Sequence, residues 1–284
     1  MKLLARLLIV LLFAAQGAAA AEVVRFPRPE FEGDRRFDYA RELLKLALSK
    51  VGPDYRVEHA ESPMNQERQI LELEAGRTID VAPMPSSAER EARLLAVYIP
   101  INRGVLGLRL GLVRKGDAAQ FAGVNSLDDV KRLRLAQGQY WPDTEILRAN
   151  GIPVIIGPSY EGLFKMLVGN RFDYFPRSVL EIWNEQASNA DALEVEPRIA
   201  LYYPYYTAYF MLNKGNTRLS EIIRQGLEKA IADGSADRLF DQHFGERLRR
   251  AQLDKRVIIE LKNPLVTPGT PVNRPELWYD YRRK

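Results

Sequence analysis

Short β-prone runs alternate with helical patterns along most of this 284-residue chain, and no other feature constrains its fold as much. Residues 23–26, 55–59 and 79–83 are β-prone, whereas residues 40–51 repeat apolar side chains every three or four positions, as one face of a helix requires. A second helical pattern covers residues 65–75 and ends at a glycine. This alternation predicts an α/β protein with mainly parallel strands.

The stretch from residue 94 to 113 is long, apolar and β-prone, and Pro100, Gly104 and Gly107 interrupt it. It suits a strand that leaves one lobe and enters another, because a second α/β series follows. In that series we expect strands at 133–137, 154–157 and 172–175 and helices at 144–150 and 160–168. Near residue 202 an aromatic run begins, and a helical pattern over 219–232 follows it, which indicates a return to the first lobe.

These patterns predict two α/β lobes joined by two hinge crossings. Lobe one would comprise residues 22–108 plus 205–262, and lobe two residues 109–204. Residues 263–284 hold four prolines, so we expect an extended C-terminal arm packed on the body. Ligands of open α/β sheets bind beyond the carboxyl ends of the strands. The residues that follow each strand are therefore the candidates for function.

Residues 1–21 have the layout of a secretory signal peptide. Lys2 and Arg6 precede an apolar stretch from residue 7 to 15, and small residues follow as far as Ala21. The apolar stretch is shorter than the roughly 20 residues that a spanning helix needs. No cysteine follows it, so we expect cleavage near Ala21 and a soluble, unanchored protein in the periplasm.

The composition excludes several classes of function. The 41 Lys and Arg residues and the 37 Asp and Glu residues are dispersed along the chain, which argues against a nucleic-acid binder. The chain has no cysteine and only two histidines, His59 and His243, so thiolate and histidine-rich metal sites are excluded. Phosphate-binding glycine loops and nucleophile elbows are absent from the sequence. We therefore expect no cofactor, no metal and no enzymatic activity.

The first candidate binding segment directly follows the strand at 79–83 and contains Ser86, Ser87 and Arg90. Two hydroxyls and a guanidinium at the start of a helix suit a ligand carboxylate. In the alternative interpretation, Ser86 and Glu89 form a capping box and Arg90 is a solvated surface charge.

The second candidate segment lies between the strand at 133–137 and the next helix, and it contains Trp141, Asp143 and Thr144. Asp143 or Thr144 would cap that helix in either interpretation. Trp141 would cover either a ligand or the neighbouring lobe, because an indole in a polar turn usually covers something.

Arg177, between a strand end and a helix start, would face the cleft opposite Arg90. Two converging guanidiniums favour an anionic ligand. The neighbouring Ser178 and Glu181 have capping-box spacing, which explains both without a function. Glu30 could reach a ligand amine. The tyrosines of the run at 202–209 could floor the cleft or pack in the core and hinge.

With these residues in place, the chain resembles the bacterial extracellular solute-binding proteins of family 3, which serve polar amino-acid ABC transporters. The stretch from Gly76 to Arg90 is similar to the family's "G-x-x-D-…-M-S-x-T-x-x-R" segment. The resemblance implies that Arg90 binds a ligand α-carboxylate and that Ser87 stands at the family's threonine. It also implies that the loop from Gly138 to Thr144 completes the carboxylate site.

Two positions depart from the family pattern. The family's serine is Pro85 here, and the position that usually holds an aspartate for the ligand amine falls near Arg177 or Ser178. A positive or neutral group cannot hold an ammonium, so Glu30 or Asp143 would have to take over that role. A doubly anionic or carboxylate-only ligand is equally compatible with the sequence.

We therefore predict a monomeric, two-lobed periplasmic solute-binding protein of the type II fold. It would capture a small carboxylate-bearing, amino-acid-like or anionic ligand by hinge closure and deliver it to an ABC-type importer. Two alternatives keep the fold. One is a ligand sensor for a membrane signalling partner, and the other is a periplasmic enzyme similar to cyclohexadienyl dehydratases, with Glu30, Asp143 or Glu181 as its acid or base.

Overall fold

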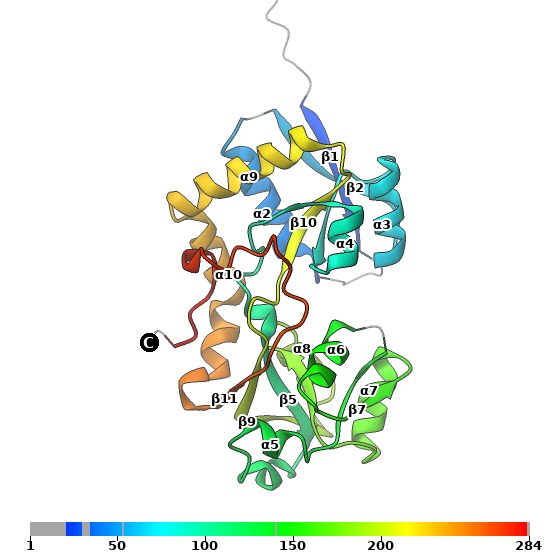
Figure 1. Ribbon diagram of the computed structural model, residues 1–284, viewed down its shortest axis with the longest axis vertical. Coiled ribbons are helices and arrows are strands. Elements are labelled where there is room, and N and C mark those ends of the chain that lie inside the picture. The colour runs from blue at the N-terminus through cyan, green and yellow to red at the C-terminus, as the bar shows by residue number, and fades with distance from the viewer. Residues whose placement is uncertain (1–20, 30–34, 53, 140, 283–284) are drawn as a thin grey trace, which may run out of the picture.

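The computed structural model describes residues 21–29, 35–52, 54–139 and 141–282. The predicted signal peptide, except for its last residue, lies outside these ranges, and so does Glu30. Two α/β lobes lie one above the other, and the chain crosses between them (Figure 1). No helix in the described ranges is long and apolar enough to cross a membrane.

The first lobe contains two small sheets. Its strands are β1 (Glu22–Arg28), β2 (Tyr55–Pro63), β3 (Val81–Pro85), β4 (Leu95–Val97) and β10 (Ala208–Leu212). Its helices are α2 (Asp38–Ser49), α3 (Gln66–Ala75), α4 (Ala88–Arg93) and α9 (Thr217–Ala232). β1 pairs with β2 in parallel, and β10 lies between β3 and β4, antiparallel to both.

The second lobe also contains two sheets. Its strands are β5 (Leu108–Arg114), β6 (Leu135–Gly138), β7 (Val154–Gly157), β8 (Phe175–Ser178), β9 (Leu193–Tyr202) and β11 (Val257–Glu260). Its helices are α5 (Leu127–Val130), α6 (Pro142–Ala149), α7 (Tyr160–Val168) and α8 (Ile182–Ala187). The larger sheet has the order β11-β9-β5-β8, and β6 pairs with β7 in parallel.

The strands next to the two crossings pair antiparallel, so the prediction of mainly parallel strands was wrong there. β5 enters the second lobe and β9 leaves it, and the two run side by side in opposite directions. β10 then returns antiparallel to β3 and β4. Because the chain enters and leaves the second lobe through the same hinge, the strands on either side of the two crossings run in opposite directions.

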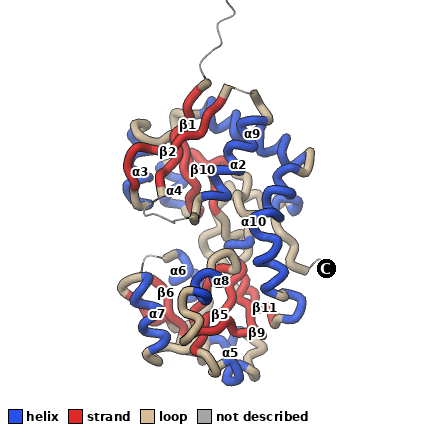
Figure 2. Tube along the Cα trace, turned by 180° about the vertical axis from the view of Figure 1, so that it is seen from behind, coloured by secondary structure: helices blue, strands red, loops and turns tan. Residues whose placement is uncertain are grey.

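The sequence did not predict α10 (Ser235–Ala251), which lies against both lobes (Figure 2). Gly234, with φ of 72°, makes the turn between α9 and α10. The Phe244 ring of α10 packs against Tyr39 of the first lobe at 4.6 Å between centroids. Further along α10, Arg247 donates a hydrogen bond of 2.7 Å to the carbonyl oxygen of Leu180 in the second lobe.

β11 also differs from the expectation, which placed residues 205–262 in the first lobe. Val257–Glu260 pairs in parallel with β9 and so extends the larger sheet of the second lobe. Residues 263–282 contain no strand and only a short 3₁₀ turn at Pro275–Leu277. Similar turns occur at Val105–Gly107, Ala118–Phe121 and Leu253–Lys255.

Gly226 allows α9 to pack closely on α2. A Cβ atom added at Gly226 would lie 2.0 Å from the carbonyl oxygen of Ala47. We expect Gly226→Ala to lower the free energy of unfolding by about 1 to 3 kcal/mol, because it overpacks this contact. Urea unfolding followed by circular dichroism measures the effect. Gly123→Ala is the control, because nothing lies within 4 Å of its added Cβ, and equal effects of both changes would contradict the prediction.

Candidate functional site

Arg90 occupies the last turn of α4, a short helix that begins directly after β3. Its guanidinium donates to the carbonyl oxygen of Pro85 at 2.8 Å and to Oε1 of Gln66 at 2.9 Å. These bonds use two of the five N–H groups of the guanidinium. Burial lowers the pKa of Arg90, whereas Tyr206 and Glu89 raise it. Within the described part of the chain, no carboxylate forms an ion pair with Arg90.

The two serines of this segment have structural partners. Ser87 is the N-cap of α4, because its hydroxyl accepts a hydrogen bond of 3.2 Å from the backbone N–H of Arg90. The Ser86 hydroxyl donates to a carboxylate oxygen of Glu91. The expected capping box of Ser86 and Glu89 was therefore wrong, since the helix begins one residue later.

Asp143 is buried in the second lobe and forms an ion pair with Arg109 of β5, at 3.1 Å. Burial raises the pKa of Asp143, and Arg109 and Arg177 oppose that shift. Arg109 itself is only 3% exposed, and its guanidinium carbon lies 5.4 Å from the ring centroids of both Tyr203 and Tyr206. Asp143 therefore has a cationic partner within its own lobe.

The predicted caps of α6 were wrong. Trp141 is the N-cap residue, and Pro142 fills the first helical position, which suits a residue that has no N–H to donate. The Thr144 hydroxyl donates to the carbonyl oxygen of Gly138 at 2.8 Å. Thr144 therefore fixes the loop between β6 and α6.

Trp141 packs on its own lobe. Its ring is stacked over Phe175, with 6.3 Å between centroids and 9° between planes. The Arg177 guanidinium lies 4.8 Å from the Trp141 ring centroid, which is a cation–π contact. A Cβ atom at Gly138 would lie 2.7 Å from the same indole. The glycine thus lets the ring lie flat against the end of β6.

Arg177 is neutralised by two carboxylates. Its guanidinium lies 2.6 Å from Glu185 and 3.2 Å from Glu181, and the Arg177 side chain is 8% exposed. Both carboxylates raise its pKa against the opposing effect of burial. Arg177 is therefore not a free positive charge opposite Arg90. Ser178 does not begin the next helix either, because Glu181 is the N-cap residue of α8.

Glu181 is the most open carboxylate of this cluster, with 37% of its side chain exposed. One of its oxygens lies 3.2 Å from Arg177 and 3.9 Å from Arg109. The second-lobe cluster contains two guanidiniums and three carboxylates, so it carries one excess negative charge when all are ionised. Its members are Arg109, Asp143, Arg177, Glu181 and Glu185.

Tyr206 lies in the crossing from β9 to β10, between the two lobes. Burial is the main cause that raises the pKa of its phenol. The other charges that act on this phenol come from both lobes: Asp143, Arg109, Arg90 and Glu181. Tyr206 therefore experiences charges from both lobes, and its ring contacts the Arg109 guanidinium at 5.4 Å.

The sequence missed three of these residues as site residues. Arg109 could have been found, because it is the one charge in the apolar stretch from Val105 to Val113. Glu181 was interpreted as half of a capping box or as a possible enzyme acid, and Tyr206 was one of several tyrosines with two interpretations. In the described ranges, no group of three or more acidic or histidine side chains could hold a metal ion.

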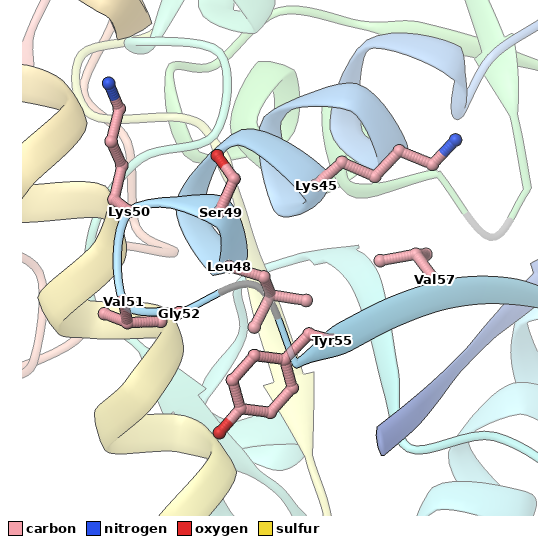
Figure 3. Close-up of a pocket in the computed structure, with 8 residues that line it drawn as sticks. All are labelled: Lys45, Leu48, Ser49, Lys50, Val51, Gly52, Tyr55 and Val57. Carbon is pink, nitrogen blue, oxygen red and sulfur yellow. The ribbon is translucent and has the colours of Figure 1, made fainter. Parts of the chain in front are cut away.

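A separate pocket of about 480 Å³ lies in the first lobe, between the end of α2 and the start of β2 (Figure 3). Leu48 and Tyr55 are among the side chains around it, and the Lys50 amine points away from Tyr55. That amine pairs with Asp233 at 2.5 Å. None of the predicted site residues lines this pocket.

No protein-family model matches the chain, and no curated protein matches its sequence. Solved structures do match. A probable amino-acid ABC transporter extracellular-binding protein of Bacillus subtilis is similar, with a TM-score of 0.60 and 20% identity, over 80% of this chain and 99% of that chain. An ancestral arginine-binding protein bound to arginine has a TM-score of 0.55 and 20% identity, over 80% of this chain and 100% of the other.

The L-cystine solute receptor of Neisseria gonorrhoeae, in an unliganded open conformation, has a TM-score of 0.53 and 18% identity. The match covers 80% of this chain and 93% of the receptor. At such identities the likeness shows the fold alone. The predicted two-lobed, type II periplasmic-binding-protein fold is confirmed, and the resemblance to family 3 is confirmed at the level of the fold.

Proposed function

We propose that the chain is an extracytoplasmic solute-binding protein whose ligand is a zwitterion of the amino-acid type, held between Arg90 and Glu181. The observation that carries this proposal is the division of charge across the cleft. Arg90 in the first lobe has no carboxylate partner among the described residues, whereas the second-lobe cluster has three carboxylates and only two guanidiniums.

Each end of such a ligand has a chemical match. A planar guanidinium with unused N–H groups suits a carboxylate, because the two can form paired hydrogen bonds. At the other end, Glu181 suits an ammonium, since it is the carboxylate of the cluster that is open to solvent. Asp143 does not suit that role, because it is buried against Arg109. The proposal therefore assigns the ammonium to Glu181, whereas the sequence offered Glu30 or Asp143; Glu30 lies outside the described residues.

The fold supports capture by hinge closure. A ligand that contacts one wall recruits the other and shifts the equilibrium between open and closed forms by its difference in affinity for them. Residues 1–21 and the fold together support export to the periplasm, with a membrane importer as the receiving partner.

A ligand screen tests this function. The chain from residue 22 onward is heated with amino acids, dicarboxylates, keto acids and small peptides, and its unfolding midpoint is recorded. A ligand at 100 times its dissociation constant adds about 2.7 kcal/mol, which raises the midpoint by roughly 5 to 11 °C for a chain of this size. We expect stabilisation by amino acids. Stabilisation by carboxylates that lack an amine, and by no amino acid, would overturn the proposal.

Glu181→Gln tests the amine end of the site. The change removes the charge and keeps the shape, so we expect amine-bearing ligands to bind about 10- to 150-fold more weakly, since a hydrogen bond to a charged group is worth about 1.5 to 3 kcal/mol. Calorimetric titration measures the affinity. Glu161→Gln, at an exposed position on α7 of the same lobe, is the matched control. Unchanged affinity in Glu181→Gln would remove Glu181 from the site.

A further inference from the structure

The described part of the C-terminal arm, residues 263–282, starts from the second lobe. Just before the arm, two hydrogen bonds join Lys262 to Asn150. The backbone N–H of Lys262 donates to the Asn150 side-chain oxygen at 2.8 Å, and the Asn150 side-chain amide donates to the Lys262 carbonyl oxygen at 2.7 Å. Asn150 is the C-cap of α6. Asn263 then donates to the carbonyl oxygen of Pro204, at 2.8 Å, in the crossing from β9 to β10.

The middle of the arm is attached to the first lobe. The Thr267 hydroxyl donates to Glu91 of α4 at 2.9 Å. Gly269 lies directly against the Tyr98 ring, since an added Cβ would be 2.1 Å from it. Arg274 makes a bidentate ion pair with Glu228 of α9, with N···O distances of 2.5 and 2.9 Å. These attachments involve three separate segments of the first lobe.

The end of the arm lies across the hinge. The Trp278 ring lies on Gly104, where an added Cβ would be 2.7 Å from it, and packs against Tyr205 at 5.0 Å between centroids. Gly104 and Tyr205 belong to the two different crossings between the lobes. The Tyr279 N–H donates to the carbonyl oxygen of Arg103 at 2.8 Å.

After the hinge, the arm reaches the second lobe again. Tyr281 packs on Tyr202 of β9 at 4.9 Å between ring centroids, and Arg282 pairs with Glu260 of β11 at 3.3 Å. The arm therefore runs from the second lobe to the first, over both crossings, and back to the second (Figure 1). A rotation of one lobe against the other must break or stretch at least one of these attachments.

We propose that the C-terminal arm is a strap that limits how far the two lobes rotate apart. Its aromatic residue Trp278 holds the two crossings together, and its polar attachments hold the lobes on either side. One attachment leads to the candidate site, because Glu91 also accepts a hydrogen bond from Ser86. Apparent affinity decreases when a smaller fraction of the molecules is competent to bind. By restricting the open form, the strap keeps that fraction high and so strengthens ligand binding. Only this last consequence rests on the proposed function.

Distances between spin labels test the strap without any ligand. The chain has no cysteine, so cysteines introduced at the exposed positions Glu67 on α3 and Glu161 on α7 carry the only labels. Pulsed dipolar spectroscopy then gives the distribution of distances between the lobes. We expect a chain that ends at residue 262, and the variant Trp278→Ala, to add longer distances that the labelled parent lacks.

Two further variants sharpen this experiment. Arg274→Ala breaks the attachment to α9 and is expected to add the same longer distances. Arg224→Ala is its matched control, because it breaks an Arg–Glu pair within α9 that does not involve the arm. Circular dichroism establishes that each variant is folded, and Trp278→Ala decides the question if the shortened chain does not fold. An unchanged distance distribution in folded Trp278→Ala would overturn the proposal, even where the ligand screen succeeds.

Discussion

Arg90→Ala is expected to lose nearly all affinity for the ligand while remaining folded. Removing one partner of a buried, hydrogen-bonded charge pair costs about 2 to 5 kcal/mol, which corresponds to a roughly 30-fold to more than 1,000-fold rise in the dissociation constant. The loss is large because the carboxylate of the ligand would be desolvated in the cleft without a cation. Titration calorimetry, with the ligand that the screen identifies, measures it.

The same helix provides a matched control for Arg90. Arg93 of α4 pairs with Glu74 of α3 at 2.6 Å, and both side chains are 34% exposed. Exposed ion pairs contribute little, so Arg93→Ala should bind the ligand like the parent. Arg90→Lys should fall between the two, because an ammonium keeps the charge but loses the bidentate geometry. Parental affinity in Arg90→Ala would show that the carboxylate is held elsewhere.

Asp143→Asn is expected to destabilise the ligand-free protein strongly. Removing one partner of a buried ion pair costs about 3 to 5 kcal/mol, which lowers the unfolding midpoint by roughly 6 to 20 °C for a chain of this size. The substitution leaves Arg109 buried, and the remaining carboxylate that pairs with it among the described residues is Glu181, at 3.9 Å. Arg109 cannot escape this penalty, because a guanidinium does not lose its proton in proteins. Thermal unfolding followed by circular dichroism measures the effect.

Arg109→Met should be milder and should depend on pH, because a buried carboxyl can take up a proton. Burial already raises the pKa of Asp143, and loss of Arg109 raises it further. A group whose pKa is raised in the folded state stabilises below its ordinary pKa and loses that contribution as pH rises through the folded value. The variant should therefore be least stable at high pH and recover towards low pH. A midpoint drop that does not vary with pH would contradict this account.

The control for the buried pair is an exposed pair in the same lobe. Asp128 and Lys131 lie 2.8 Å apart at the end of α5 and are largely solvated. Lys131→Met should change the midpoint very little, since exposed pairs are worth about 0 to 1 kcal/mol. Equal effects of Lys131→Met and Asp143→Asn would mean that burial of the Arg109–Asp143 pair is not what matters.

Local patterns predicted the fold class and many of the elements. Helix α2 follows the apolar spacing of Ala40 to Leu48, and a capping box of Ser126 and Asp129 begins α5. Helix α10 was missed, although Phe240, Phe244 and Leu248 bury one face at steps of four. The position of β11 could not be predicted, because its four residues carry no sign of the strand with which they pair.

The candidate site shows the same limit. The sequence placed Arg90 and Arg177 after strands, and both lie after or at strand ends. What it could not give was the partner of each charge. From the sequence, Arg177 is a free cation and Asp143 a free anion. In the structure, Arg177 pairs with Glu185 and Asp143 pairs with Arg109. Both partners are distant enough in sequence that only the tertiary structure reveals them.

The place of β10 between β3 and β4 has a consequence for the order of assembly. The ribosome makes β10 only after β5 to β9 of the second lobe, yet this strand is the centre of the first lobe's three-stranded sheet. The sheet cannot close until a late segment reaches an early one, and such non-local pairing is intrinsically slow to fold. A nascent chain built in this way stays unfolded for longer, which would suit the export that we propose for it.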